Sequence, residues 1–150
     1  MPFTSRAKAK DAILTEVRKV VDALLDERAI EKAIWDAKPE SRPSEATKTW
    51  IRVTLTHVPG SAQVGSLNGC PESGSRRYNR TASLGIQIFE PSGNGREVGD
   101  AIGERFENAL QGKLDAEALV FRNVGTTEAG TDGPWDQTNT TATVLYDVFA

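Results

Sequence analysis

Apolar residues recur at three- and four-residue steps near the N-terminus, and this periodicity leaves few folds open to the chain. The stripe consists of Ile13, Val17, Val20, Val21, Leu24 and Leu25. Such spacing predicts an amphipathic α-helix over residues 5–28, with Thr4 or Ser5 as its N-cap. Because a helix cannot bury its own apolar stripe, other elements of the chain must cover it.

A second periodicity, with apolar side chains at every other position, predicts the elements that cover this helix. It occurs at 50–58 and at 81–89, which we expect to be two antiparallel β-strands. Their apolar faces consist of Ile51, Val53 and Leu55, and of Leu84, Ile86 and Ile88. Further strands are expected at 119–127 and 140–149. The connection between these two is glycine-rich and holds Gly125, Gly130, Gly133, Pro134 and Trp135.

The remaining pattern predicts a second helix and completes the fold class. A helical stripe over 95–111 is formed by Val98, Ile102, Phe106, Ala109 and Leu110. A short apolar run at 33–35 is either a first strand or a docked turn. We therefore predict one α+β domain, 1–150, with two helices packed on one face of a four- or five-stranded, mostly antiparallel or mixed sheet.

The segment 60–80, between the first two strands, is long and polar and contains four glycines. It cannot bury much apolar area by itself, so we expect a hairpin loop that is mobile in the free subunit. The end of the segment is cationic and consists of Arg76, Arg77, Tyr78 and Arg80. Arginine and tyrosine are favoured at protein interfaces, so we expect protein contact there, with contact to a phosphate backbone as the weaker alternative.

Charge and composition exclude several classes of protein. The net charge of −3 disfavours broad nucleic-acid binding, and residues 101–150 carry 3 basic and 8 acidic groups. No apolar run approaches the roughly 20 residues that a membrane-spanning helix needs. The polar start of the chain lacks the apolar stretch of a secretory signal, and the single Cys70 has no partner for a disulfide. We therefore expect a reducing compartment.

The sequence offers few candidates for catalysis. The only histidine, His57, ends a strand, and Cys70 lies in the following loop without a recognisable base or family signature. The run 93–96 follows a strand and opens a helix, but it lacks the third glycine of a dinucleotide-binding turn and the parallel unit around it. We predict no catalytic residue, no cofactor and no metal site, and keep a small enzyme using Cys70 and His57 as the rival hypothesis.

The second face of the sheet indicates self-assembly instead. Trp50, Phe89 and Leu145 fall opposite the helix-facing residues, and Arg52 lies among them. No third helix is available to cover them, so we expect this face to contact another subunit. The candidate interface residues are therefore Trp50, Arg52, Arg76, Arg77, Tyr78, Arg80, Phe89 and Leu145. The acidic last third could pair head to tail with the arginine-bearing loop of an adjacent subunit.

The order of these motifs resembles a known family. Trp50-Ile51-Arg52 opens a strand, Ile86-Gln87-Ile88-Phe89 is followed by Pro91 and a glycine turn, and the chain ends in Leu145-Tyr146-Asp147-Val148-Phe149. This arrangement, over about residues 5–149, is similar to the tail terminator proteins of long-tailed bacteriophages and their prophage relatives.

The resemblance implies a mixed sheet with helices on one side and a ring, typically a hexamer, that caps the tail tube. Such a ring ends tube polymerisation and presents a surface for head joining. The implied partners are copies of this chain, the tail tube protein and head–tail connector proteins. The implied location is the virion tail or neck, after assembly in the cytoplasm of the bacterial host. Another neck or tail-completion protein of the same fold is the closest alternative.

Overall fold

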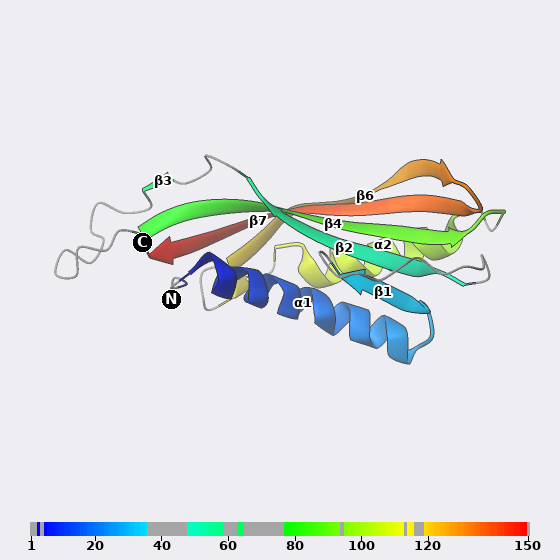
Figure 1. Cartoon of the computed structure of the whole chain (residues 1–150), viewed down its shortest axis with the longest axis horizontal. Helices are drawn as coiled ribbons and strands as arrows, with labels where there is room; N and C mark the ends of the chain where they lie inside the picture. The colour runs from blue at the N-terminus through cyan, green and yellow to red at the C-terminus, as the bar shows by residue number, and fades with distance from the viewer. Residues whose placement is uncertain are drawn as a thin grey trace.

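The computed structural model describes residues 3, 5–35, 48–58, 63–64, 77–93, 95–112, 114–115 and 119–149. Within them the chain forms one seven-stranded sheet and two helices that lie on the same side of it (Figure 1). The elements are α1 (Arg6–Asp26), β1 (Lys32–Trp35), β2 (Trp50–His57), β3 (Gln63–Val64), β4 (Arg77–Pro91), α2 (Glu97–Leu110), β5 (Leu114–Asp115), β6 (Leu119–Asp132) and β7 (Trp135–Phe149).

The sheet is mixed but mostly antiparallel. Its strand order is β1-β2-β4-β7-β6-β5, and β3 pairs with β4 off this path. Only β1 and β2 run parallel; every other pair of described strands is antiparallel. Three strands dominate, since β4 and β7 have 15 residues each and β6 has 14. The predicted α+β class is confirmed, and the run 33–35 is a strand rather than a docked turn.

The core lies between the helices and one face of the sheet. From α1, Ile13, Val17 and Leu24 are fully buried, and from α2 Ile102 and Phe106 are buried with them. The sheet contributes the inward-facing positions of four strands: Ile51, Val53, Leu55, Ala82, Leu84, Ile86, Ile88, Leu119, Phe121, Ala142, Val144, Tyr146 and Val148. Burial of both helical stripes against one sheet face confirms the packing that the two periodicities predict.

Two glycines let α2 approach the sheet closely. A Cβ atom at Gly103 would lie 2.6 Å from Thr126 Cγ2, and one at Gly99 would lie 2.8 Å from Thr138 Oγ1. Since neither distance leaves room for a methyl group, the helix sits against β6 and β7 only because these positions have no side chain. Thr126 and Thr140 face the same helix, and their hydroxyl oxygens are 2.9 Å apart.

The long strands correct two sequence predictions. The glycine-rich connection expected between 127 and 140 is wrong, because β6 continues to Asp132 and β7 begins at Trp135. Gly125 and Gly130 lie at register shifts where the strand is irregular, and such shifts accommodate glycine within a sheet. The predicted loop 60–80 is too long, since 63–64 and 77–80 are in strands; the rest of it lies outside the described residues.

Candidate functional site

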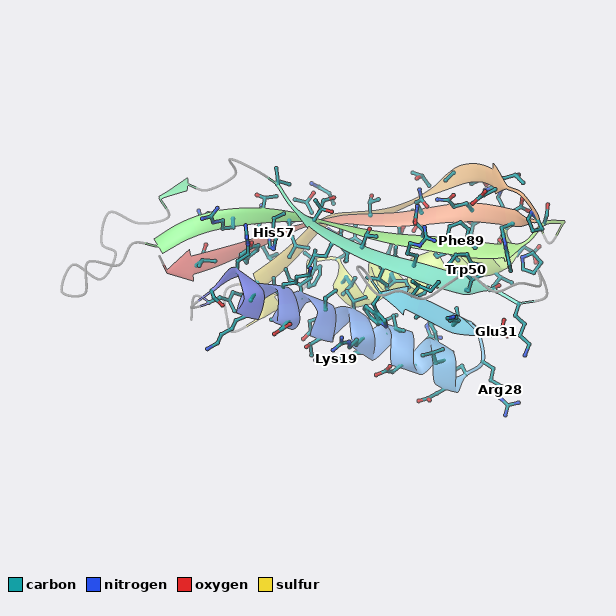
Figure 2. The ribbon with its side chains drawn as sticks, viewed as in Figure 1. Lys19, Arg28, Glu31, Trp50, His57 and Phe89 are labelled. Atoms are coloured by element: carbon teal, nitrogen blue, oxygen red, sulfur yellow. The ribbon has the colours of Figure 1, made fainter. Side chains whose placement is uncertain are left out.

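The aromatic residues predicted on an open sheet face form a second, smaller core. Trp50 is 0% exposed and Phe89 is 3% exposed, and they pack with Ile34 and Trp135. The rings of Trp50 and Phe89 are stacked with centroids 4.3 Å apart, and Trp135 meets Trp50 edge-on at 5.9 Å. Figure 2 shows Trp50 and Phe89 together toward one end of the sheet. The prediction that these two residues form an uncovered contact surface is therefore wrong.

Strand register explains this burial. β1 lies beside β2 and places Ile34 opposite Arg52. β7 lies beside β4 and places Trp135 opposite Pro91, which is two positions after Phe89 and so on the same face. All of these side chains consequently share the face opposite the helices. Arg52, half-buried, has its guanidinium carbon 5.6 Å from the Trp50 ring centroid and 5.9 Å from that of Phe89. It covers the cluster through cation–π contacts, and its role in a subunit interface stays a prediction.

The rest of this face is polar. Its central positions, which alternate with the core-facing residues, are Thr54, Gln87, Asn139, Thr141 and Thr143. Gln137 Nε2 donates to Asn139 Oδ1 at 2.8 Å, and Thr54 Oγ1 donates to the carbonyl of Gly85. Leu145 is half-buried. An antiparallel sheet with such a face can be covered by water alone, so the sheet face no longer requires a second subunit.

A cationic cluster lies at the opposite end of the sheet, around His57. The Tyr146 hydroxyl lies 2.7 Å from His57 Nδ1, and Tyr146 is 1% exposed. Burial lowers the pKa of His57, and the charges of Arg6, Lys10 and Arg80 lower it further. The neutral imidazole can accept a hydrogen bond from the phenolic O–H at Nδ1, while burial raises the pKa of Tyr146 and keeps it protonated. We call Arg6, Lys10 and Arg80 the cationic end.

The other predicted loop residues are only partly visible. Arg77 and Tyr78 lie in β4, where Tyr78 is in register with Val64 and Val148, but only their backbone is described. Arg76 lies outside the described residues. Arg80 is half-buried in β4 and belongs to the cationic end. Among the sequence-predicted cations, the structure thus brings Arg80 together with Arg6 and Lys10, which the sequence analysis did not single out.

The rival enzymatic arrangement gains no geometric support. His57 Nδ1 is engaged by Tyr146, and Cys70 lies outside the described residues. In the described part of the chain, no group of three or more His, Cys, Asp or Glu residues could hold a metal ion. The run 93–96 leads from β4 into α2, and Arg96 fastens it by donating from Nη1 to the carbonyl of Gln137 at 2.8 Å.

Carboxylates form a continuous stripe along α2, which we call the acidic face. It consists of Glu97, Asp100, Glu104 and Glu107. The first three are exposed and Glu107 is half-buried, so the stripe is a largely solvated face of the helix. None of the four has an ion-pair partner among the described residues. Glu128 of β6, with 67% of its side chain exposed, lies nearby, 4.0 Å from Arg96 Nε.

Sequence reasoning missed a buried acid beneath the first turn of α2. Glu90 is fully buried, and its Oε1 accepts a hydrogen bond from the Gly99 amide at 3.2 Å. Burial raises the pKa of Glu90, although the Gly99 hydrogen bond opposes this shift. Its Oε2 and Thr138 Oγ1 are buried without a hydrogen-bond partner in the described structure. Strand alternation could have revealed this burial, because position 90 continues the series 84, 86 and 88, whose side chains face the core.

A groove of about 580 Å³ lies between the end of α1 and the outer side of α2. Its floor is apolar and includes Leu24, Ala29 and Ile102, and Arg28 and Lys48 belong to its lining. Glu27 and Arg105 join the two helices beside it through a pair of hydrogen bonds. Cations and carboxylates both line the groove, so its charge selects no class of ligand.

Comparison with known proteins supports the fold alone. No family model and no curated protein matches the chain. One of the matching solved structures has a TM-score of 0.51 at 10% sequence identity, with 89% of this chain and 94% of that chain covered. That protein's name states no activity or partner, and at this identity the likeness extends to the fold alone. No helix among the described residues is long and apolar enough to cross a membrane.

Proposed function

We propose that this chain is a structural tail assembly protein, similar to phage tail terminators, that forms a ring and caps the tail tube. The observation that carries the proposal is the agreement between the fold and the motif order. The resemblance implies a mixed sheet with helices on one side, and the chain folds as a mixed sheet with α1 and α2 on one face. The motifs that carry the resemblance lie in β2, β4 and β7, the strands that adjoin in the sheet.

The described surface suits assembly better than catalysis. Its charged groups form extended areas on α1 and α2, whereas the one histidine is held by a buried tyrosine. Under this proposal the ring ends tube polymerisation and offers its other side to the head connector. The partners are copies of the chain, the tail tube protein and connector proteins.

The proposal is tested by imaging tubes formed from the tube protein of the same phage or prophage. The tagged protein is added to tubes, and its position is recorded by electron microscopy with a label on the tag. We expect label at one end of each tube and a ring-shaped density there. Label along the tube walls, or no label, would count against a terminator.

The closest alternative is another neck or tail-completion protein of the same fold. The two are separated by offering the protein purified tubes and purified connector complexes in parallel. A terminator binds tube ends without the connector. Binding to connectors alone, with bare tube ends left free, would favour the alternative.

A further inference from the structure

Two oppositely charged surfaces lie on different parts of the molecule. The cationic end is where α1 begins, β2 ends and β4 enters the sheet, and His57 marks it in Figure 2. The acidic face runs along α2, which lies under the other half of the sheet (Figure 1). Because the two surfaces are far apart on an elongated molecule, they cannot neutralise each other within one copy.

Three positive charges lie together at the cationic end, with Asp11 of α1 next to Lys10 in the sequence. None of Arg6, Lys10 and Arg80 has a carboxylate partner among the described residues, and all three act on the same imidazole. The first turn of α1 contains no acidic residue, so the positive end of the helix dipole adds to the three charges. Such a potential attracts an anionic surface.

The acidic face is accessible along its length. Glu97 and Asp100 lie in the first turn of α2, and the last turn contains no basic residue. Beside the helix, β5 pairs with β6 only at Leu119 and Val120. Beyond Val120, no described strand covers that edge of the sheet, so a docking partner can reach α2 from this side.

We propose that the cationic end of one copy docks on the acidic face of the next copy, head to tail. A docked pair then keeps one free surface of each kind, so the same contact repeats until the chain of subunits closes. This inference rests on the proposed function, since it supplies the subunit contact of the ring. The committed occupant is a second copy, because one chain carries both complementary surfaces.

Two charge-reversed variants test the contact. The first carries Arg6→Glu and Lys10→Glu; the second carries Glu104→Lys and Glu107→Lys. Arg6 lies in the first turn of α1 and Glu107 in the last turn of α2, where the new charges suit the helix dipole, so both variants should fold, as circular dichroism would verify. Alone, each should associate at least about tenfold more weakly than the parent in sedimentation or light-scattering titrations. An equimolar mixture should recover the parent's association, because alternating copies restore opposite charges at every contact.

The control carries Arg18→Glu and Lys19→Glu, exposed positions about two turns beyond Lys10 on α1 and outside both surfaces, and makes the same change in net charge as the first variant. It should associate like the parent. The proposal is overturned if the folded variants associate like the parent, or if the mixture does not recover. A parent that stays monomeric at every concentration and on tube ends also overturns it. Loss of binding to a single-stranded oligonucleotide in the first variant, with assembly intact, would assign the cationic end to nucleic acid instead.

The outcomes separate this contact from the proposed function. If the parent forms rings that the reversals abolish but never caps tubes, the contact stands and the terminator function falls. If both reversed variants still form rings and cap tubes, the function stands and this contact falls.

Discussion

At the residue scale, the buried Glu90 links strand β4 to the first turn of α2. Its hydrogen bond from the Gly99 amide satisfies one of the free N–H groups at the start of that helix. Because the pKa of Glu90 is raised by burial, the folded state holds its proton more tightly than the unfolded chain does. This contribution to stability is present below the unfolded pKa and is lost as pH rises through the folded pKa.

We therefore expect Glu90→Gln to stabilise the protein at pH values above the folded pKa and to flatten the pH dependence. The amide keeps an oxygen for the Gly99 N–H and carries no charge. Each unit of pKa shift corresponds to about 1.4 kcal/mol, which sets the scale of the gain. Urea titrations from acid to alkaline pH measure it. Parallel stability profiles for parent and variant would show that Glu90 has no such role.

A second residue-scale prediction concerns the contact of α2 with β6. Gly103→Ala should destabilise the protein by about 1–3 kcal/mol, because its Cβ would meet Thr126 at 2.6 Å. Gly125→Ala is the matched control, since nothing lies within 4 Å of a Cβ there. The control should change the free energy of unfolding by less than about 0.5 kcal/mol. Equal losses at both positions would mean that the close approach of α2 to β6 does not account for the cost of a side chain at Gly103.

At the element scale, the aromatic cluster shows why β1 and the start of β7 matter. Ile34 and Trp135 come from segments far apart in sequence, and both cover the stacked pair Trp50 and Phe89. Phe89→Ala should therefore cost about 3–5 kcal/mol of unfolding free energy, as for other large core truncations. Val58→Ala, at an exposed position, should cost far less. If Phe89→Ala is as stable as the parent but no longer associates, Phe89 belongs to a subunit interface rather than to the core.

The same elements show what the sequence could and could not predict. Both helices, the strand 50–58 and the inward face of β4 follow from periodicity, because each apolar position recurs with the period of its element. Which face a residue occupies was therefore predictable for Trp50 and Phe89. Their exposure was not, because it depends on Trp135 arriving from β7. The continuation of β6 beyond 127, through Gly130 to Asp132, was missed because glycine usually marks a turn.

The sequence likewise predicted some features of the charged surfaces and not others. Arg80 was predicted as a contact residue from its local cluster, and the acidic spacing on α2 was visible in the sequence. The proximity of Arg80 to Arg6 and Lys10 could not be predicted from the sequence. Arg6 and Lys10 lie on α1 and come near Arg80 only because that helix packs beside the sheet. Charge complementarity between two distant surfaces is a property of the folded chain.

At the scale of the whole molecule, separated charges predict salt-sensitive assembly. Raising ionic strength from about 0.1 M to about 1 M shortens the Debye length from about 10 Å to about 3 Å. Association of the parent should weaken by at least about tenfold over this range. Sedimentation equilibrium at several salt concentrations measures the change. Association that is unchanged or stronger in high salt would indicate an apolar interface and contradict the charged contact.

The central proposal is that this chain stops the growth of a tail tube. Measuring the length of tubes grown in its presence tests this proposal most directly. Purified tube protein is polymerised with increasing amounts of the chain, and tube lengths are recorded by electron microscopy. We predict that mean length falls as the amount of chain rises, with each capped end inactive toward further tube protein. The double variant Arg6→Glu and Lys10→Glu should leave lengths near those without any addition. Tubes of unchanged length at every ratio of parent chain to tube protein would contradict the account.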